Sequence, residues 1–114
     1  MPFTAAFIAH APDADPSRDR SLLETGLYRL FSVVVRDTDQ AIAVCRELVA
    51  GEGLQSVLLC PGNSHDDVAR VAAALGDGVS VSVARGDARS MRVAAKAMEE
   101  AGWFAPARDE VMPA

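Results

Sequence analysis

Cysteine and aromatic residues are scarce in this sequence. Cys45 and Cys60 are the only two cysteines among 114 residues. Two cysteines are too few for a disulfide framework, so we interpret both as reduced thiols in a cytoplasm. Aromatic residues make up 5% of the chain, which leaves no evident platform for stacking a flavin or a nucleic-acid base. Trp103 and Phe104, adjacent near the end, are the exception.

Excess basic charge and long apolar runs are also missing. The formal net charge is −5, and no block of like charge occurs. Nucleic acids and anionic membranes attract basic surfaces, so we expect neither as a partner. No apolar run approaches the roughly 18 residues of a membrane span. The apolar stretch at the start is short and follows no basic residue, so a signal peptide is not expected.

Hydrophobic residues are abundant, at 50% of the chain, which is enough for one domain with a real core. We predict a single domain over residues 1–104 and a C-terminal tail over 105–114. Apolar runs predict strands, and apolar residues at helical spacing predict helices. The expected strands cover residues 3–9, 27–35, 54–60 and 79–84, and the expected helices cover about 40–50, 64–75 and 90–101.

Helices between strands imply crossover connections, so we predict an α/β fold built from βαβ units. Its sheet would be mainly parallel and four-stranded, with three main helices. The link before residue 27 fits two structures. We expect a short helix over about 16–23, and the alternative is an extra strand in a hairpin with 27–35. The alternation VSVSVA over 79–84 predicts an edge strand, or a strand whose small side chains form a contact surface.

Ligands of parallel α/β sheets bind at the carboxyl ends of the strands, so the residues there are candidates. His10 follows the first strand, and Cys60 and His65 follow the third. An imidazole can act as a general acid or base, and a thiol near an imidazole and a helix start can be a nucleophile. The structural alternative is that Cys60 is buried and inert. Nothing in the spacing of these three residues demands a metal site, and no cofactor is indicated.

The turn after Cys60 has a second interpretation as a plain helix start. Ser64 and Asp67 have capping-box spacing, and Ser64 does not lie in a Gly-x-Ser-x-Gly elbow. The amides of Gly62, Asn63 and Ser64 could instead cradle an anion. The carboxylates of Asp66 and Asp67 count against that binding mode, because they already occupy the positive helix end.

Arginines cluster around the start of the last expected helix, although the chain is acidic. Arg85 and Arg89 could hold a phosphate or carboxylate together with the helix amides. The alternative is that they are solvated or pair with acidic residues such as Asp87.

Three stretches resemble a family of small bacterial α/β proteins of unknown function: AAFIAHAP near the start, LLCPGNSH in the middle and VSVARGD later. The resemblance covers about residues 3–87. It implies a compact α/β domain and assigns no catalytic residue.

Two functions follow as hypotheses. The first is binding of a small anionic metabolite at the strand carboxyl edge, with or without catalysis. The second is a non-catalytic structural or regulatory homo-oligomer that acts through protein–protein contacts, supported by the small-residue face of 79–84 and by Trp103 and Phe104.

Overall fold

A computed structural model describes residues 1–104 of the chain, so the expected tail over 105–114 lies outside the described residues. Strands and helices follow one another in the α/β order that the sequence predicts. The elements are β1 (Phe3–His10), β2 (Arg20–Glu24), β3 (Tyr28–Val35), α1 (Thr38–Glu52), β4 (Ser56–Leu59), α2 (His65–Leu75), β5 (Ser80–Val83) and α3 (Ala88–Glu100).

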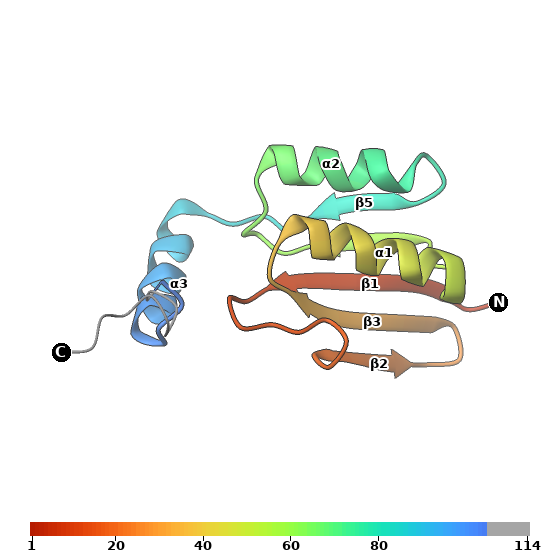
Figure 1. Cartoon of the computed structure of the whole chain (residues 1–114), viewed down its shortest axis with the longest axis horizontal. Coiled ribbons are helices and arrows are strands. Elements are labelled where there is room, and N and C mark those ends of the chain that lie inside the picture. Colours follow the sequence, from red (N-terminus) through yellow and green to blue (C-terminus); the bar gives the residue numbers. More distant parts are fainter. Residues whose placement is uncertain (105–114) are drawn as a thin grey trace.

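The strands form one mixed sheet of five strands in the order β2-β3-β1-β4-β5 (Figure 1). Neighbouring strands are parallel except β2, which is antiparallel to β3. The α/β class is therefore confirmed, and the four-stranded sheet is wrong. β5 lies at an edge of the sheet, as its strict alternation indicated.

The extra strand β2 replaces the short helix expected over about 16–23. Helical hydrogen bonding is limited to one turn, in which the amide of Asp19 donates to the carbonyl of Asp15 at 2.7 Å. The chain then pairs with β3, and Leu22 lies opposite Phe31. This pairing satisfies the backbone groups of β3 that would otherwise line a bare edge. The hairpin alternative is therefore the correct one.

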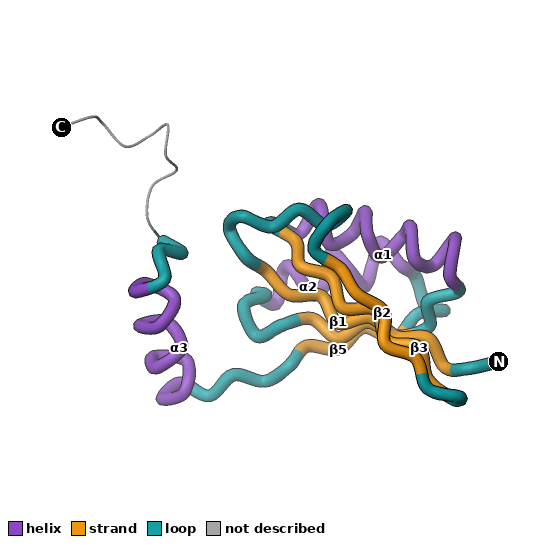
Figure 2. The backbone as a smooth tube through the Cα atoms, turned by 90° about the horizontal axis from the view of Figure 1, so that it is seen from below, coloured by secondary structure: helices purple, strands orange, loops and turns teal. Residues whose placement is uncertain are grey.

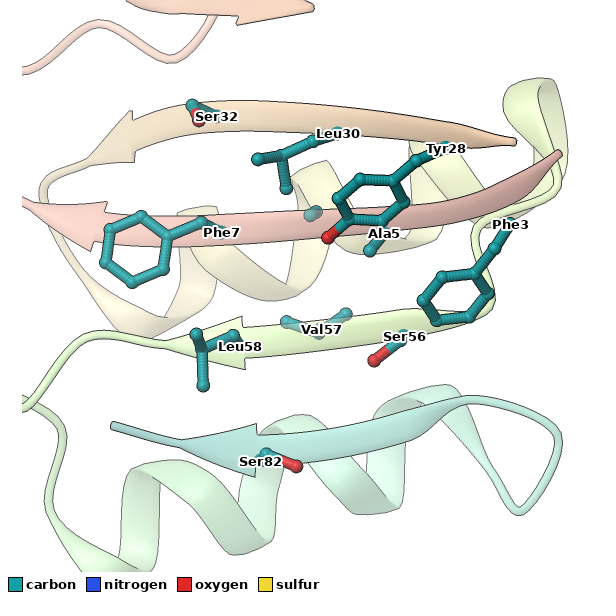
Figure 3. Close-up of a pocket in the computed structure, with 11 residues that line it drawn as sticks. Phe3, Ala5, Phe7, Tyr28, Leu30, Ser32, Ser56, Val57, Leu58 and Ser82 are labelled. Carbon is teal, nitrogen blue, oxygen red and sulfur yellow. The ribbon is translucent and has the colours of Figure 1, made fainter. Parts of the chain in front are cut away.

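Helices α1 and α2 pack side by side on one face of the sheet and enclose the core (Figure 2). Every second strand residue points toward them, because side chains alternate along a strand. The fully buried side chains include Ile8, Val33, Val35, Leu48, Val57, Leu59 and Val71. No helix of the described residues covers the opposite face of the sheet, which Figure 3 shows from its exposed side.

Local sequence sets the starts of α1 and α2. The Asp37 carboxylate accepts from the amide of Gln40 at 2.8 Å and caps α1. Ser64 and Asp67 form the expected capping box at the start of α2. Each helix therefore begins just after the carboxyl end of a strand, so both helix starts lie at the same edge of the sheet.

Helix α3 lies beyond that edge and crosses the ends of the strands (Figures 1 and 2). Its apolar residues Met91, Ala94 and Met98 are half-buried, and none of its residues is fully buried. A helix that follows a strand usually packs on a face of the sheet. Helix α3 does not, so it adds no layer to the sheet. Among the helices of residues 1–104, none is long and apolar enough to cross a membrane.

Candidate functional site: a thiol and an imidazole at the strand carboxyl edge

The strand order brings His10 and Cys60 together at the edge where the parallel strands end. β1 and β4 are neighbours, and Ile8 lies opposite Leu59 in their register. His10 is the last residue of β1, and Cys60 follows β4. The Nδ1 atom of His10 lies 3.5 Å from the Sγ atom of Cys60. Two candidates that are 50 positions apart in sequence therefore share one site.

Asn63 joins this pair through its side chain. Its Nδ2 atom donates to the carbonyl of Cys60 at 3.0 Å and lies 3.6 Å from the sulfur. The same atom lies 3.4 Å from Nδ1 of His10. Asn63 is buried, and its Oδ1 atom has no hydrogen-bond partner among the described residues. The sequence had pointed to its backbone amide, whereas the side chain makes these contacts.

A cavity of about 570 Å³ opens on this group. Its floor is the strand edge, and its opposite wall is α3 with the two aromatic residues that follow it. The ionisable side chains in the lining are those of His10 and Cys60, and Trp103 carries an indole N–H donor. The lining residues are Ala9, His10, Cys60, Pro61, Gly62, Met91, Ala94, Ala95, Met98, Trp103 and Phe104.

Other sequence candidates lie outside the cavity lining. Ser64 is engaged in the cap of α2, and His65 is exposed as the first residue of that helix. Arg85 forms an ion pair with Asp87 at 2.8 Å, which matches the structural alternative. Arg89 is exposed on α3.

Asp67 places a carboxylate beside the site. It accepts from the amide of Ser64 at 2.9 Å and from the hydroxyl of Thr38 at 2.9 Å. These hydrogen bonds, that of the Ser64 amide first, hold the pKa of Asp67 below its ordinary value, with a smaller contribution from the charge of His10. No sequence pattern points to Thr38, because its contact with Asp67 depends on how α1 and α2 pack.

Cys45 has the opposite environment to Cys60. It is fully buried in α1, and the loss of solvent raises the pKa of its thiol to about 12. Cys45 is therefore a packing residue, and the chemistry of the site depends on Cys60.

The thiol of Cys60 and the imidazole of His10 line the cavity, so they can bind a polar group and exchange a proton. The sulfur and Nδ1 are close enough for the proton of Cys60 to pass to His10, as in a nucleophile–base pair. A complete triad would also need a group that holds the other ring nitrogen. Asn63 contacts Nδ1 and therefore does not fill that role. No group of three or more histidine, cysteine or acidic side chains within residues 1–104 is arranged to hold a metal ion.

Comparison with known protein families assigns the chain to a family. Residues 3–99 match a family of unknown function, DUF6506. The chain belongs to the DUF6506 family. This confirms the resemblance to an uncharacterised family and extends it past residue 87 into α3. The DUF6506 match thus includes the strand ends, the turn after Cys60 and most of the α3 wall of the cavity. A search of curated proteins and a search of solved structures each find no match to the chain.

Proposed function

We propose that this protein binds a small molecule in the cavity between α3 and the carboxyl ends of β1 and β4. The cavity itself carries the proposal. Its volume of about 570 Å³ lies within the range of about 300–1,000 Å³ that is typical of ligand sites. Ligand sites are also mostly apolar with a few convergent polar groups, and here those groups are His10 and Cys60.

The lining defines the chemistry of the ligand. An apolar body fits against Met91, Met98 and Trp103, and one polar group meets His10 and Cys60. The sequence suggested an anionic metabolite held by arginines. Because neither Arg85 nor Arg89 lines the cavity, we narrow that proposal to a mostly apolar molecule with one hydrogen-bonding or carboxylate group.

A ligand in the cavity would stabilise helix α3 more than any other element. It has 13 residues, and an isolated helix of that length is marginal in water. Its stability therefore depends on contacts along its apolar side. A molecule that fills the cavity would pack against Met91 and Met98 and hold α3 at the edge of the sheet.

The test uses protein labelled with ¹³C at its methionine methyl groups. Met91 and Met98 line the cavity, and Met1 lies at the exposed N-terminus as an internal control. The probes are 3-phenylpropionate, its amide and propylbenzene, which share an apolar body and differ in the polar group. We expect the first two to shift the Met91 and Met98 signals, to leave Met1 unchanged, and to bind more tightly than propylbenzene.

A pair of variants on α3 provides the control. Ala94→Trp places an indole in the cavity, and Ala97→Trp adds the same group to α3 outside the lining. Binding should be lost in the first variant and kept in the second. If none of the probes shifts Met91 or Met98, or if binding survives Ala94→Trp, the cavity is not the binding site.

Self-association is a second candidate function, and exposed apolar side chains on the sheet favour it. Phe3, Leu23 and Leu58 are 49%, 66% and 41% exposed. Under this alternative the protein acts through contacts between copies of the chain. Sedimentation equilibrium measures its mass directly, and a monomer at every concentration would exclude this function.

We also propose a cytoplasmic location, which is compatible with both candidate functions. Cys45 and Cys60 are free thiols. A reducing compartment would keep Cys60 available at the cavity floor.

A further inference from the structure

The face of the sheet opposite α1 and α2 is an uncharged surface of apolar side chains and serines, which we call the open face. It carries the alternate strand residues that do not point into the core, including Phe3, Phe7, Tyr28, Leu30, Leu58 and Ser82 (Figure 3). The register makes them neighbours, because Phe3 lies opposite Tyr28 and Leu58 lies opposite both Phe7 and Ser82. Parallel strands are usually covered on both faces, so this surface lacks its second layer.

Charge is segregated away from the open face. The charged residues of β2 and β3 alternate to the helix side, where Arg20 bonds to Glu47 at 2.7 Å and Arg29 bonds to Glu52 at 2.8 Å. The residues of the five strands that point to the open face are all uncharged. Two copies of an acidic protein can therefore meet at this face without opposing like charges.

The open face also has a shape that can fit its own copy. A hollow of about 500 Å³ lies on it, with the small residues Ala5 and Ser56 among its lining. Phe3 and Tyr28 stack at one side of the hollow with ring centroids 5.8 Å apart, and Phe7 and Leu58 lie at the other side (Figure 3). A hollow and protruding side chains on one surface are what a two-fold symmetric contact requires.

We propose that the open face is the interface of an isologous homodimer, in which a second copy of this chain covers it. The proposal rests on the self-association considered above and assigns its surface. The five strands have 8, 5, 8, 4 and 4 residues. At about 3.3 Å per residue and about 4.8 Å between strands, they cover a flat area of roughly 460 Å². Specific interfaces bury about 800 Å² per partner, so the dimer contact would include the protruding side chains and the rim of the sheet as well as the strands. Phe7 and Leu58 of each copy would enter the hollow of the other.

The experiment is sedimentation equilibrium of the full chain from low to high micromolar concentration. Leu58→Lys and Ser82→Arg place a positive charge on the open face at exposed positions, and Val93→Lys places the same charge on α3, far from the sheet face. We expect a dimer for the unchanged protein and for Val93→Lys. The two face variants should dissociate at least tenfold more readily, and circular dichroism should show that they remain folded.

The possible outcomes distinguish two claims: that copies of the chain associate, and that they associate through the open face. An unchanged protein that is monomeric throughout would overturn both this inference and the self-association, and α3 or residues 105–114 would then be the segments to test as a cover. A dimer that survives both Leu58→Lys and Ser82→Arg would overturn the open-face interface alone.

Discussion

The two cysteines differ in their surroundings, and their reactivity should differ accordingly. Cys60 lines the cavity beside His10, whereas Cys45 is buried and burial raises its pKa to about 12. A thiolate is the reactive form, so iodoacetamide at mildly alkaline pH should modify Cys60 and spare Cys45 in the folded protein. Peptide mass spectrometry with time measures both rates in one sample. Comparable rates at the two sites would contradict this assignment.

Asp67 should make stability depend on pH. Its pKa is lower in the folded protein, so its contribution is fully present above the unfolded value of about 3.9 and is lost as the pH falls through the folded value. The melting temperature should therefore be higher than that of Asp67→Asn at neutral pH, and the two should converge as the pH falls below about 4. Asp66→Asn is the control, because Asp66 has no side-chain hydrogen bond among the described residues. A constant difference between the protein and Asp67→Asn at all pH values would contradict this prediction.

At the scale of the element, two glycines of α1 have opposite roles. Gly53 ends the helix with φ of 69° and ψ of 38°, and its amide donates to Leu48. Gly51 lies within the helix, and an added Cβ would meet nothing within 4 Å. Gly53→Ala should therefore destabilise the protein by about 1 kcal/mol, and Gly51→Ala should stabilise it by about 0.5–1 kcal/mol. Urea unfolding measures both, and equal effects would show that the helix end is not set by Gly53.

Helix α3 differs from α1 and α2 in what its apolar side contacts. All three carry apolar residues at helical spacing, and in α1 and α2 these residues pack on the sheet. In α3 the same pattern faces a cavity instead. Gly86 leaves room for the Met91 side chain in this position, because a Cβ there would lie 2.7 Å from the Met91 sulfur and 3.3 Å from Pro61. The amphipathic pattern thus predicted the helix correctly, while its packing partner followed from the fold.

At the scale of the whole molecule, association should link stability to concentration. If the folded state is a dimer, raising the protein concentration favours it by mass action. The melting temperature should then rise by about 3 °C for each tenfold increase in concentration. The melting temperature of Leu58→Lys should be lower than that of the unchanged protein at the same concentration, and Val93→Lys should behave as the unchanged protein. A concentration-independent melting temperature for the unchanged protein would contradict a folded dimer.

The sequence alone determined most elements and the composition of the site edge. Apolar periodicity located β1, β3 and the helices, because side-chain spacing along a helix or strand is a local property. The capping box of α2 followed from Ser64 and Asp67. The positions of His10 and Cys60 at strand ends also followed from sequence, and parallel strands then place both at one edge.

The tertiary structure decided what the local pattern leaves open. β2 is a strand because β3 offers it a backbone partner, although its own residues also suit a helix. His10 meets Cys60 because β1 lies beside β4, and a strand order set by crossovers cannot be read from periodicity. The contacts of Asn63 and the exposure of the open face also follow from how the strands and helices pack. Local spacing determines which side of an element is apolar, and only the packed chain determines which sides are covered.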